Sequence, residues 1–137
     1  MVSLFWLLFV SAFMLAFMQG GREARSFAAI LLLAVVVTFL LNDHYGFVIA
    51  RPLVLVVDVC VLATALVLVV RSESFWPLWF AGFHAISVSS GLAAMLFPRG
   101  IQTLYIDSAG FWTTPALIAF AGGVWLDSRG RDPAMSV

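Results

Sequence analysis

Two ionisable side chains, Asp58 and His84, lie inside apolar runs, and they are the residues of this sequence best suited to chemistry. Asp58 interrupts LVLVVDVCVLATALVLVV, and His84 lies in FHAISVSSGLAA. An imidazole beside a carboxylate can handle protons or orient a ligand, and ionisable residues within a membrane usually face a bundle interior, a partner or water. The same pair could instead be a polar clamp that fixes helix register or contacts a partner subunit.

The composition indicates that these two residues lie in a membrane protein. Of the 137 residues, 64% are hydrophobic and 10% are charged, whereas soluble domains carry about 25% charged residues. One domain of this length cannot bury so much apolar surface, so its solvent must be lipid. The net charge is zero, which argues against a nucleic-acid partner. We predict a single transmembrane domain over residues 1–137.

Apolar runs of the length that crosses a membrane, about 17–25 residues, define the predicted helices. These cover about residues 2–18, 26–41, 52–70, 75–97 and 109–126, with a polar tail at 127–137. The last run is long enough only if its helix continues through Pro115, which removes one hydrogen bond and kinks the helix. We therefore predict an all-α, polytopic transmembrane helix bundle of five helices, with the last one kinked at Pro115. The alternative is a bundle of four helices.

The distribution of arginine predicts the orientation of the bundle. With five helices, one side carries five arginines and the other carries two. The five are Arg22, Arg25, Arg71, Arg129 and Arg131, and the two are Arg51 and Arg99. The positive-inside rule then predicts a cytoplasmic C-terminus and an outside N-terminus in a bacterial inner membrane. The first helix lacks the features of a cleaved signal peptide, so we expect it to be retained.

The short connection at residues 71–74 predicts that Asp58 and His84 meet. Asp58 lies thirteen residues before Arg71, and His84 lies eleven residues after Glu73. At about 1.5 Å per residue, these separations correspond to depths of roughly 20 and 17 Å. Helices joined by so short a connection pack antiparallel. Arg51 is an alternative partner for Asp58, although its side chain reaches the membrane surface more easily.

A stripe of small and polar residues extends from His84 along the same predicted helix. Ser87 and Gly91 share the face of His84, and Ser90 lies beside them. Such a stripe favours close helix packing with hydrogen bonds across the interface, and a pore lining would have a similar composition. The segment AFAGG, residues 119–123, offers a second small-residue packing surface.

Most of the aromatic residues with a polar edge are predicted to anchor the bundle at the membrane surfaces, where such rings concentrate. These are Trp76, Trp79, Trp112, Trp125 and Tyr105. A platform for a quinone or a pigment is the alternative interpretation. Haem held by two histidines is not expected, because His44 lies in an outer turn and His84 at mid-membrane.

The second half of the chain resembles small, uncharacterised multi-spanning proteins of bacterial inner membranes. The likeness is carried by RSESFWPLWF, which opens one predicted helix, and by FWTTPAL, which opens the last. The matching positions are Arg71, Ser72, Phe75, Trp76, Pro77, Trp79, Trp112, Pro115 and Leu117. The resemblance implies a small multi-spanning membrane protein and assigns no catalytic residue.

The sequence contains no recognisable catalytic set. It lacks a nucleophile–base pair in context, a metal-ligand cluster and a phosphate loop, so we expect no enzyme, no metal site and no cofactor. The first hypothesis is an accessory or scaffold subunit, which would contact the lipid bilayer and other membrane subunits or further copies of itself. The second is a small proton-coupled transporter or channel that uses Asp58 and His84. The third is a quinone- or pigment-binding helper protein.

Overall fold

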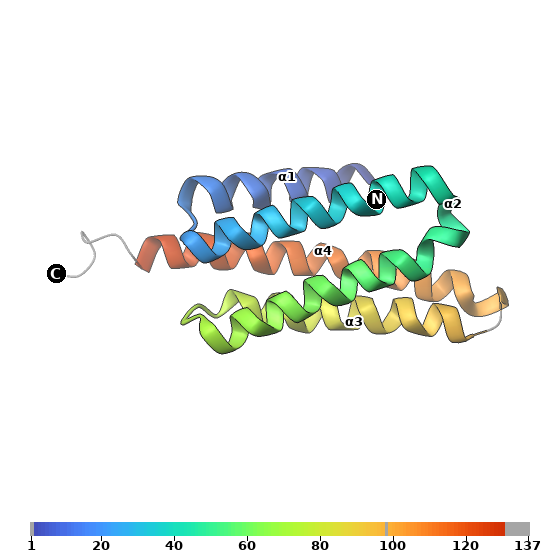
Figure 1. Ribbon diagram of the computed structural model, residues 1–137. Helices are drawn as coiled ribbons and strands as arrows, with labels where there is room; N and C mark the ends of the chain where they lie inside the picture. The colour runs from blue at the N-terminus through green and yellow to red at the C-terminus, as the bar shows by residue number, and fades with distance from the viewer. Residues whose placement is uncertain (1, 98, 131–137) are drawn as a thin grey trace.

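The computed structural model describes residues 2–97 and 99–130, and almost all of them are helical. The helices are α1 (Val2–Gln19), α2 (Arg22–Arg71), α3 (Trp76–Leu96) and α4 (Arg99–Gly130). Helix α2 bends back on itself at Gly46, and Figure 1 shows its two halves running in opposite directions. Counting these halves separately gives five helical segments, so the predicted all-α bundle of five helices is confirmed.

Four helical segments of the described chain are long and apolar enough to cross a membrane. They are Arg22–Gly46, Ile49–Arg71, Trp76–Leu96 and Ile106–Gly130, while Phe5–Gln19 forms a shorter apolar helix. This confirms a multi-pass membrane protein. Helix α4 passes through Pro115, as its predicted length required.

The helices extend beyond the apolar runs that predicted them. Helix α4 begins at Arg99, although the predicted helix begins only at about residue 109. Helical geometry satisfies backbone hydrogen bonds whether the side chains are apolar or polar, so helices continue past the hydrocarbon boundary. The predicted polar tail is likewise helical up to Gly130, whereas Arg131 and the rest of the tail lie outside the described residues.

Gly46 makes the reversal of α2 possible. Its φ of 72° and ψ of 155° lie in a region that side chains with a Cβ atom rarely adopt. A Cβ atom added there would meet no other atom within 4 Å, so the requirement for glycine comes from the backbone and not from packing. The residue ends the turn-like sequence NDHYG and brings the second half of α2 back alongside the first.

Replacing Gly46 with alanine is expected to lower the free energy of unfolding by about 1–2 kcal/mol, because a residue with a Cβ atom is strained at this φ. Gly82→Ala is the matched control, since Gly82 lies within α3 with open space around its Cα. That control should be neutral or stabilising by up to about 1 kcal/mol. Unfolding of the purified protein in mixed detergent micelles measures both values. Equal stability of the two variants would show that the reversal does not depend on glycine.

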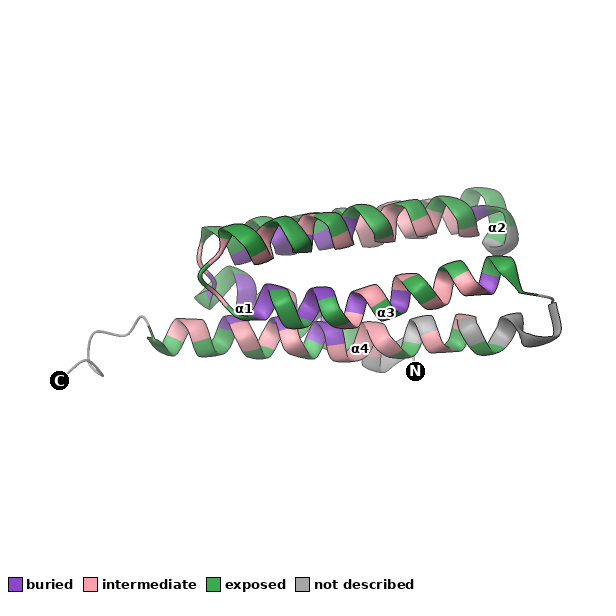
Figure 2. Ribbon diagram, turned by 90° about the horizontal axis from the view of Figure 1, so that it is seen from below, coloured by how far each residue is buried: buried purple, intermediate pink, exposed green. Residues whose placement is uncertain are grey.

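One end of the bundle, the packed pole, contains the α1–α2 turn, the α2–α3 turn and the C-terminal end of α4. Side-chain hydrogen bonds connect these pieces across the chain. Ser72 Oγ donates to Glu23 Oε2 at 2.6 Å, and Ser128 Oγ donates to Gln19 Oε1 at 3.2 Å. Figure 2 shows most of the buried positions toward this end. The opposite end, where Gly46 lies, is the hinge pole.

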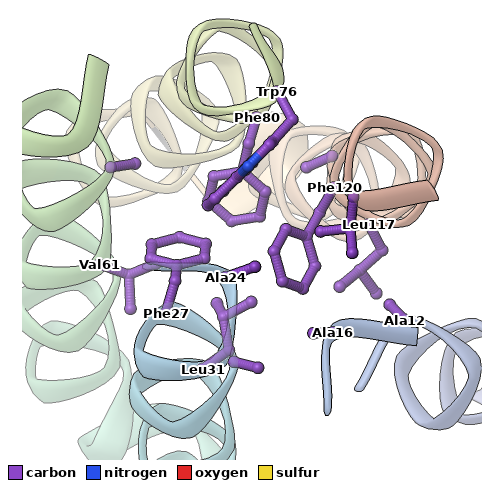
Figure 3. Close-up of a cluster of buried hydrophobic side chains, with 14 of the residues drawn as sticks. Ala12, Ala16, Ala24, Phe27, Leu31, Val61, Trp76, Phe80, Leu117 and Phe120 are labelled. Carbon is purple, nitrogen blue, oxygen red and sulfur yellow. The ribbon is translucent and has the colours of Figure 1, made fainter. Parts of the chain in front are cut away.

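Four aromatic rings form the centre of the packed pole (Figure 3). The ring centroid of Phe27 lies 4.9 Å from that of Phe80, 5.2 Å from that of Trp76 and 5.6 Å from that of Phe120. Trp76 and Phe120 are themselves 4.8 Å apart. Mutually tilted or edge-to-face rings at these distances attract each other beyond their mere contact. Buried alanines around them allow the helices to approach closely: Ala12, Ala16, Ala24 and Ala28.

Gly123 provides the closest helix approach in this core. A Cβ atom added to Gly123 would lie 2.0 Å from Cβ of Trp76, so α3 and α4 could not keep their positions with any larger residue. Gly122, one residue earlier, has no such neighbour within 4 Å. The packing surface expected from AFAGG is therefore present, and Gly123 is the residue that creates it.

Candidate functional site: a cavity within the bundle

A half-open cavity of about 450 Å³ lies among the helices, between the aromatic core and the hinge pole. All five helical segments contribute to its wall: residues 5–9 of α1, residues 31–42 and 54–61 of the two halves of α2, residues 80–87 of α3, and residues 113–117 of α4. Phe80 and Leu117 belong both to this wall and to the core, so the core forms the floor of the cavity.

The cavity wall is mainly apolar but contains six polar residues. Aromatic rings come from Phe5, Trp6, Phe9, Phe39 and Phe80. The polar side chains are Thr38, Asn42, Asp58, His84, Ser87 and Thr113. A largely apolar cavity with a few converging polar groups is the usual construction of a small-molecule site.

His84 and Asp58 meet at the cavity wall, but through the main chain of Asp58. His84 Nε2 donates a hydrogen bond to the carbonyl oxygen of Asp58 at 3.1 Å. A carbonyl oxygen only accepts, so Nε2 carries a proton in this arrangement. The ring is 6% exposed and stacks on Phe80 at 5.4 Å, and its Nδ1 atom has no hydrogen-bond partner among the described residues. His84 therefore joins α3 to α2 at the depth of Asp58.

The carboxylate of Asp58 is left available by this arrangement. The residue is half-buried, and it lines both the central cavity and a smaller neighbouring one of about 150 Å³. Asn42 also lines both cavities, whereas Arg51 lines only the smaller one. Within the described part of the chain, the carboxylate oxygens of Asp58 form no hydrogen bond and no ion pair.

The stripe predicted from the sequence contacts two helices. Ser87 Oγ lies 3.5 Å from Thr113 Oγ1, and Ser90 Oγ lies 3.4 Å from Ser108 Oγ, so both serines face α4. A Cβ atom on Gly91 would lie 3.3 Å from a methyl group of Leu55 in α2, which makes this a close approach as well. The stripe thus packs helices together, and Ser87 additionally reaches the cavity.

Sequence reasoning missed three polar residues of the cavity, Thr38, Asn42 and Thr113. Asn42 Nδ2 donates to the carbonyl oxygen of Thr38 at 2.8 Å, four residues earlier on the same helix face. The spacing of four residues, at the polar end of an apolar run, indicates from sequence alone that Thr38 and Asn42 share one helix face. Thr113 lies two residues before Pro115, inside the predicted last helix.

The five predicted interfacial anchors have different environments. Trp76 is 2% exposed and lies in the aromatic core, so the prediction of a surface anchor is wrong for this residue. The physical reason is Gly123, which leaves space for the indole between α3 and α4. Trp79 and Trp125 are exposed, as an anchor requires, and the guanidinium of Arg129 lies 3.8 Å from the centre of the Trp125 ring.

The other two predicted anchors, Trp112 and Tyr105, are not part of the cavity wall as described. Trp112 is half-buried and stacks on Phe83 with the ring centroids 6.1 Å apart. The side chain of Tyr105 lies outside the described part of the structure. Among the described residues, no three His, Cys, Asp or Glu side chains are grouped closely enough to hold a metal ion.

The fold and the cavity together define a multi-pass helical membrane protein with a half-open, partly polar cavity among its helices. Comparison of the chain with protein-family models, with curated proteins and with solved structures gave no match.

Proposed function

We propose that this protein binds a lipophilic small molecule in its central cavity, as a non-enzymatic multi-pass protein of the bacterial inner membrane. The observation that supports this proposal is the cavity itself. Its volume of about 450 Å³ lies within the range of roughly 300–1,000 Å³ that is usual for ligand sites. Aromatic rings in its wall suit an apolar body, while the polar groups suit a head group that forms hydrogen bonds.

The cavity favours binding over the other hypotheses from the sequence. A scaffold subunit has no need of a cavity with converging polar groups, although binding can serve a larger complex or a homo-oligomer. A transporter needs a path to both membrane surfaces, and the buried aromatic core lies on one side of the cavity. The proposed binding of a lipophilic molecule includes the third hypothesis, a quinone- or pigment-binding helper, as a special case.

The arginines support a particular orientation of the cavity in the membrane. Four of them lie exposed at the packed pole: Arg22, Arg25, Arg71 and Arg129. By the positive-inside rule, this pole faces the cytoplasm. The cavity then lies nearer the outer membrane surface, and a ligand enters from the outer half of the bilayer.

Filling the cavity provides the test, with 1,4-naphthoquinone as a neutral, lipophilic probe that quenches tryptophan fluorescence. Trp6 lines the cavity, so binding should quench its emission in a saturable manner when the protein is held in lipid nanodiscs. Ala34→Phe places a large ring inside the cavity wall. We expect it to weaken binding about tenfold or more, which corresponds to about 1.4 kcal/mol.

Ala29→Phe is the matched control, because Ala29 lies on the same helix but is exposed on its outer surface. This variant should bind the probe as the unmodified chain does. Trp6→Phe identifies the quenched residue, since the saturable component should disappear with the indole. Linear, non-saturable quenching of the unmodified chain would refute the proposal, as would equal binding by the Ala34→Phe and Ala29→Phe variants.

A further inference from the structure

We infer that the molecule bound in the central cavity is a lipophilic organic cation, such as a protonated amine or an onium ion, whose charge is held by the carboxylate of Asp58. This inference rests on the proposed function and specifies its ligand class. It depends on three features of the cavity wall: the partners of Asp58, the charges of the neighbouring residues, and the aromatic rings.

The first feature is the unused binding capacity of Asp58. Its main-chain carbonyl oxygen receives the hydrogen bond from His84, whereas its carboxylate oxygens have no partner among the described residues, and the residue lines the cavity. An unpaired carboxylate in an apolar environment is unfavourable, and a bound cation removes much of this penalty. Acidic residues within transmembrane helices usually face a partner or a water-filled cavity.

The second feature is the charge around Asp58. The chain contains no lysine, and among the described residues of the central cavity wall Asp58 is the one carboxylate and no arginine is present. From α3, His84 faces Asp58, but its Nε2 proton is already donated to the main chain. From the same half of α2, Arg51 lines the smaller cavity, which Asp58 lines as well, but its backbone lies about 10 Å nearer the hinge pole by helix rise. The protein therefore presents a negative group to the central cavity without an opposing positive one.

The third feature is the set of aromatic rings around the same space. The rings of Phe5, Trp6 and Phe39 line the cavity together with Asp58. Aromatic faces attract cations, most strongly where water is excluded. Such a wall binds the apolar body of a neutral molecule as well. The rings therefore select the size and apolarity of the ligand, while Asp58 selects its charge.

Two ions of matched shape and opposite charge test the inference. Tetraphenylphosphonium is a lipophilic cation, and tetraphenylborate has the same arrangement of four phenyl groups with a negative charge. Binding is measured with radiolabelled ions on protein in nanodiscs of zwitterionic phosphatidylcholine, so that lipid charge does not bias the result. We expect the unmodified chain to bind the cation saturably and to bind the anion at least about thirtyfold more weakly. The reason is that the negative charge of the anion is repelled by the carboxylate of Asp58.

Asp58→Asn should weaken binding of the cation about thirtyfold or more, while Asp58→Glu should retain most of the affinity. Asp43→Asn is the charge-matched control, because Asp43 is exposed near the Gly46 turn, and it should change nothing. Far-ultraviolet circular dichroism and unfolding in mixed micelles should be the same for the Asp58→Asn variant and the unmodified chain, which shows that the variant is folded.

The outcomes separate the two proposals. Equal binding of the two ions by the unmodified chain overturns the inference without any variant, and so does unchanged cation binding by a folded Asp58→Asn protein. In both cases saturable naphthoquinone binding leaves the cavity function standing. Failure of the unmodified chain to bind either the quinone or the cation overturns the proposed function together with the inference.

Discussion

A Gly123→Ala variant is expected to lose about 3 kcal/mol of its free energy of unfolding, at the upper end of the usual cost of overpacking. The added methyl group would lie 2.0 Å from Cβ of Trp76, which is far inside van der Waals contact. The nearest atoms are Cβ, Cγ and Cα of Trp76, and none of them is the end of a flexible side chain. Helices α3 and α4 must therefore move apart, and the aromatic core between them loses its contacts.

Gly122→Ala is the matched control for this variant. It makes the same chemical change one residue away, on the same helix, at a position with open space around the new methyl group. It should be neutral or stabilising by up to about 1 kcal/mol, since alanine is the better helix former. Unfolding in mixed micelles, followed by circular dichroism or by tryptophan fluorescence, measures both. Similar stabilities for the two variants would contradict the close approach at Gly123.

Phe27→Ala is expected to cost about 3 kcal/mol, at the lower end of the range for truncating a buried phenylalanine. Phe27 is 0% exposed, and its ring contacts those of Trp76, Phe80 and Phe120. In a bilayer the unfolded helices are solvated by lipid, which is as apolar as the core, so the hydrophobic transfer term largely vanishes. The cost then comes from the cavity left behind and from the lost dispersion contacts.

The matched control for this truncation is Phe75→Ala. Phe75 is 78% exposed and lies next to Trp76 in sequence, so the same change there removes few contacts. We expect its stability to stay within about 0.5 kcal/mol of the unmodified chain. Far-ultraviolet circular dichroism should remain unchanged in both variants under native conditions, because the helices themselves do not depend on this ring. A Phe27→Ala protein as stable as Phe75→Ala would show that the aromatic cluster does not hold the bundle together.

Much of the fold could be predicted from hydrophobic patterning, because the thickness of the bilayer limits the length of apolar helices. The number of helical segments and the passage of α4 through Pro115 followed from this constraint. The exact ends of the helices could not be predicted in this way, because polar residues beyond the apolar run remain helical. The reversal at Gly46 was indicated only by the turn-like residues around it, and its backbone conformation required the structure.

The site was predicted less completely. Counting residues from the α2–α3 turn placed Asp58 and His84 at the same depth, and the structure brings them together. The counting could not show that His84 contacts the carbonyl oxygen and leaves the carboxylate available, because helix rotation determines which atoms meet. Thr38, Asn42 and Thr113 come from segments distant in sequence, so only the folded bundle reveals that they share a cavity with Asp58. The burial of Trp76 depended on one glycine in another helix.

The separation of the packed pole from the cavity has an evolutionary consequence. The residues that hold the bundle together, such as Phe27, Trp76 and Gly123, lie at one end, and most of the polar residues that face the cavity lie beyond them. Under the proposed function, substitutions of the polar wall residues change what is bound without removing a core contact, whereas wall residues such as Phe80 and Leu117 belong to the core as well. A lineage built on this bundle with the proposed function can then diversify its ligands through these polar residues while the sequence of its core changes slowly.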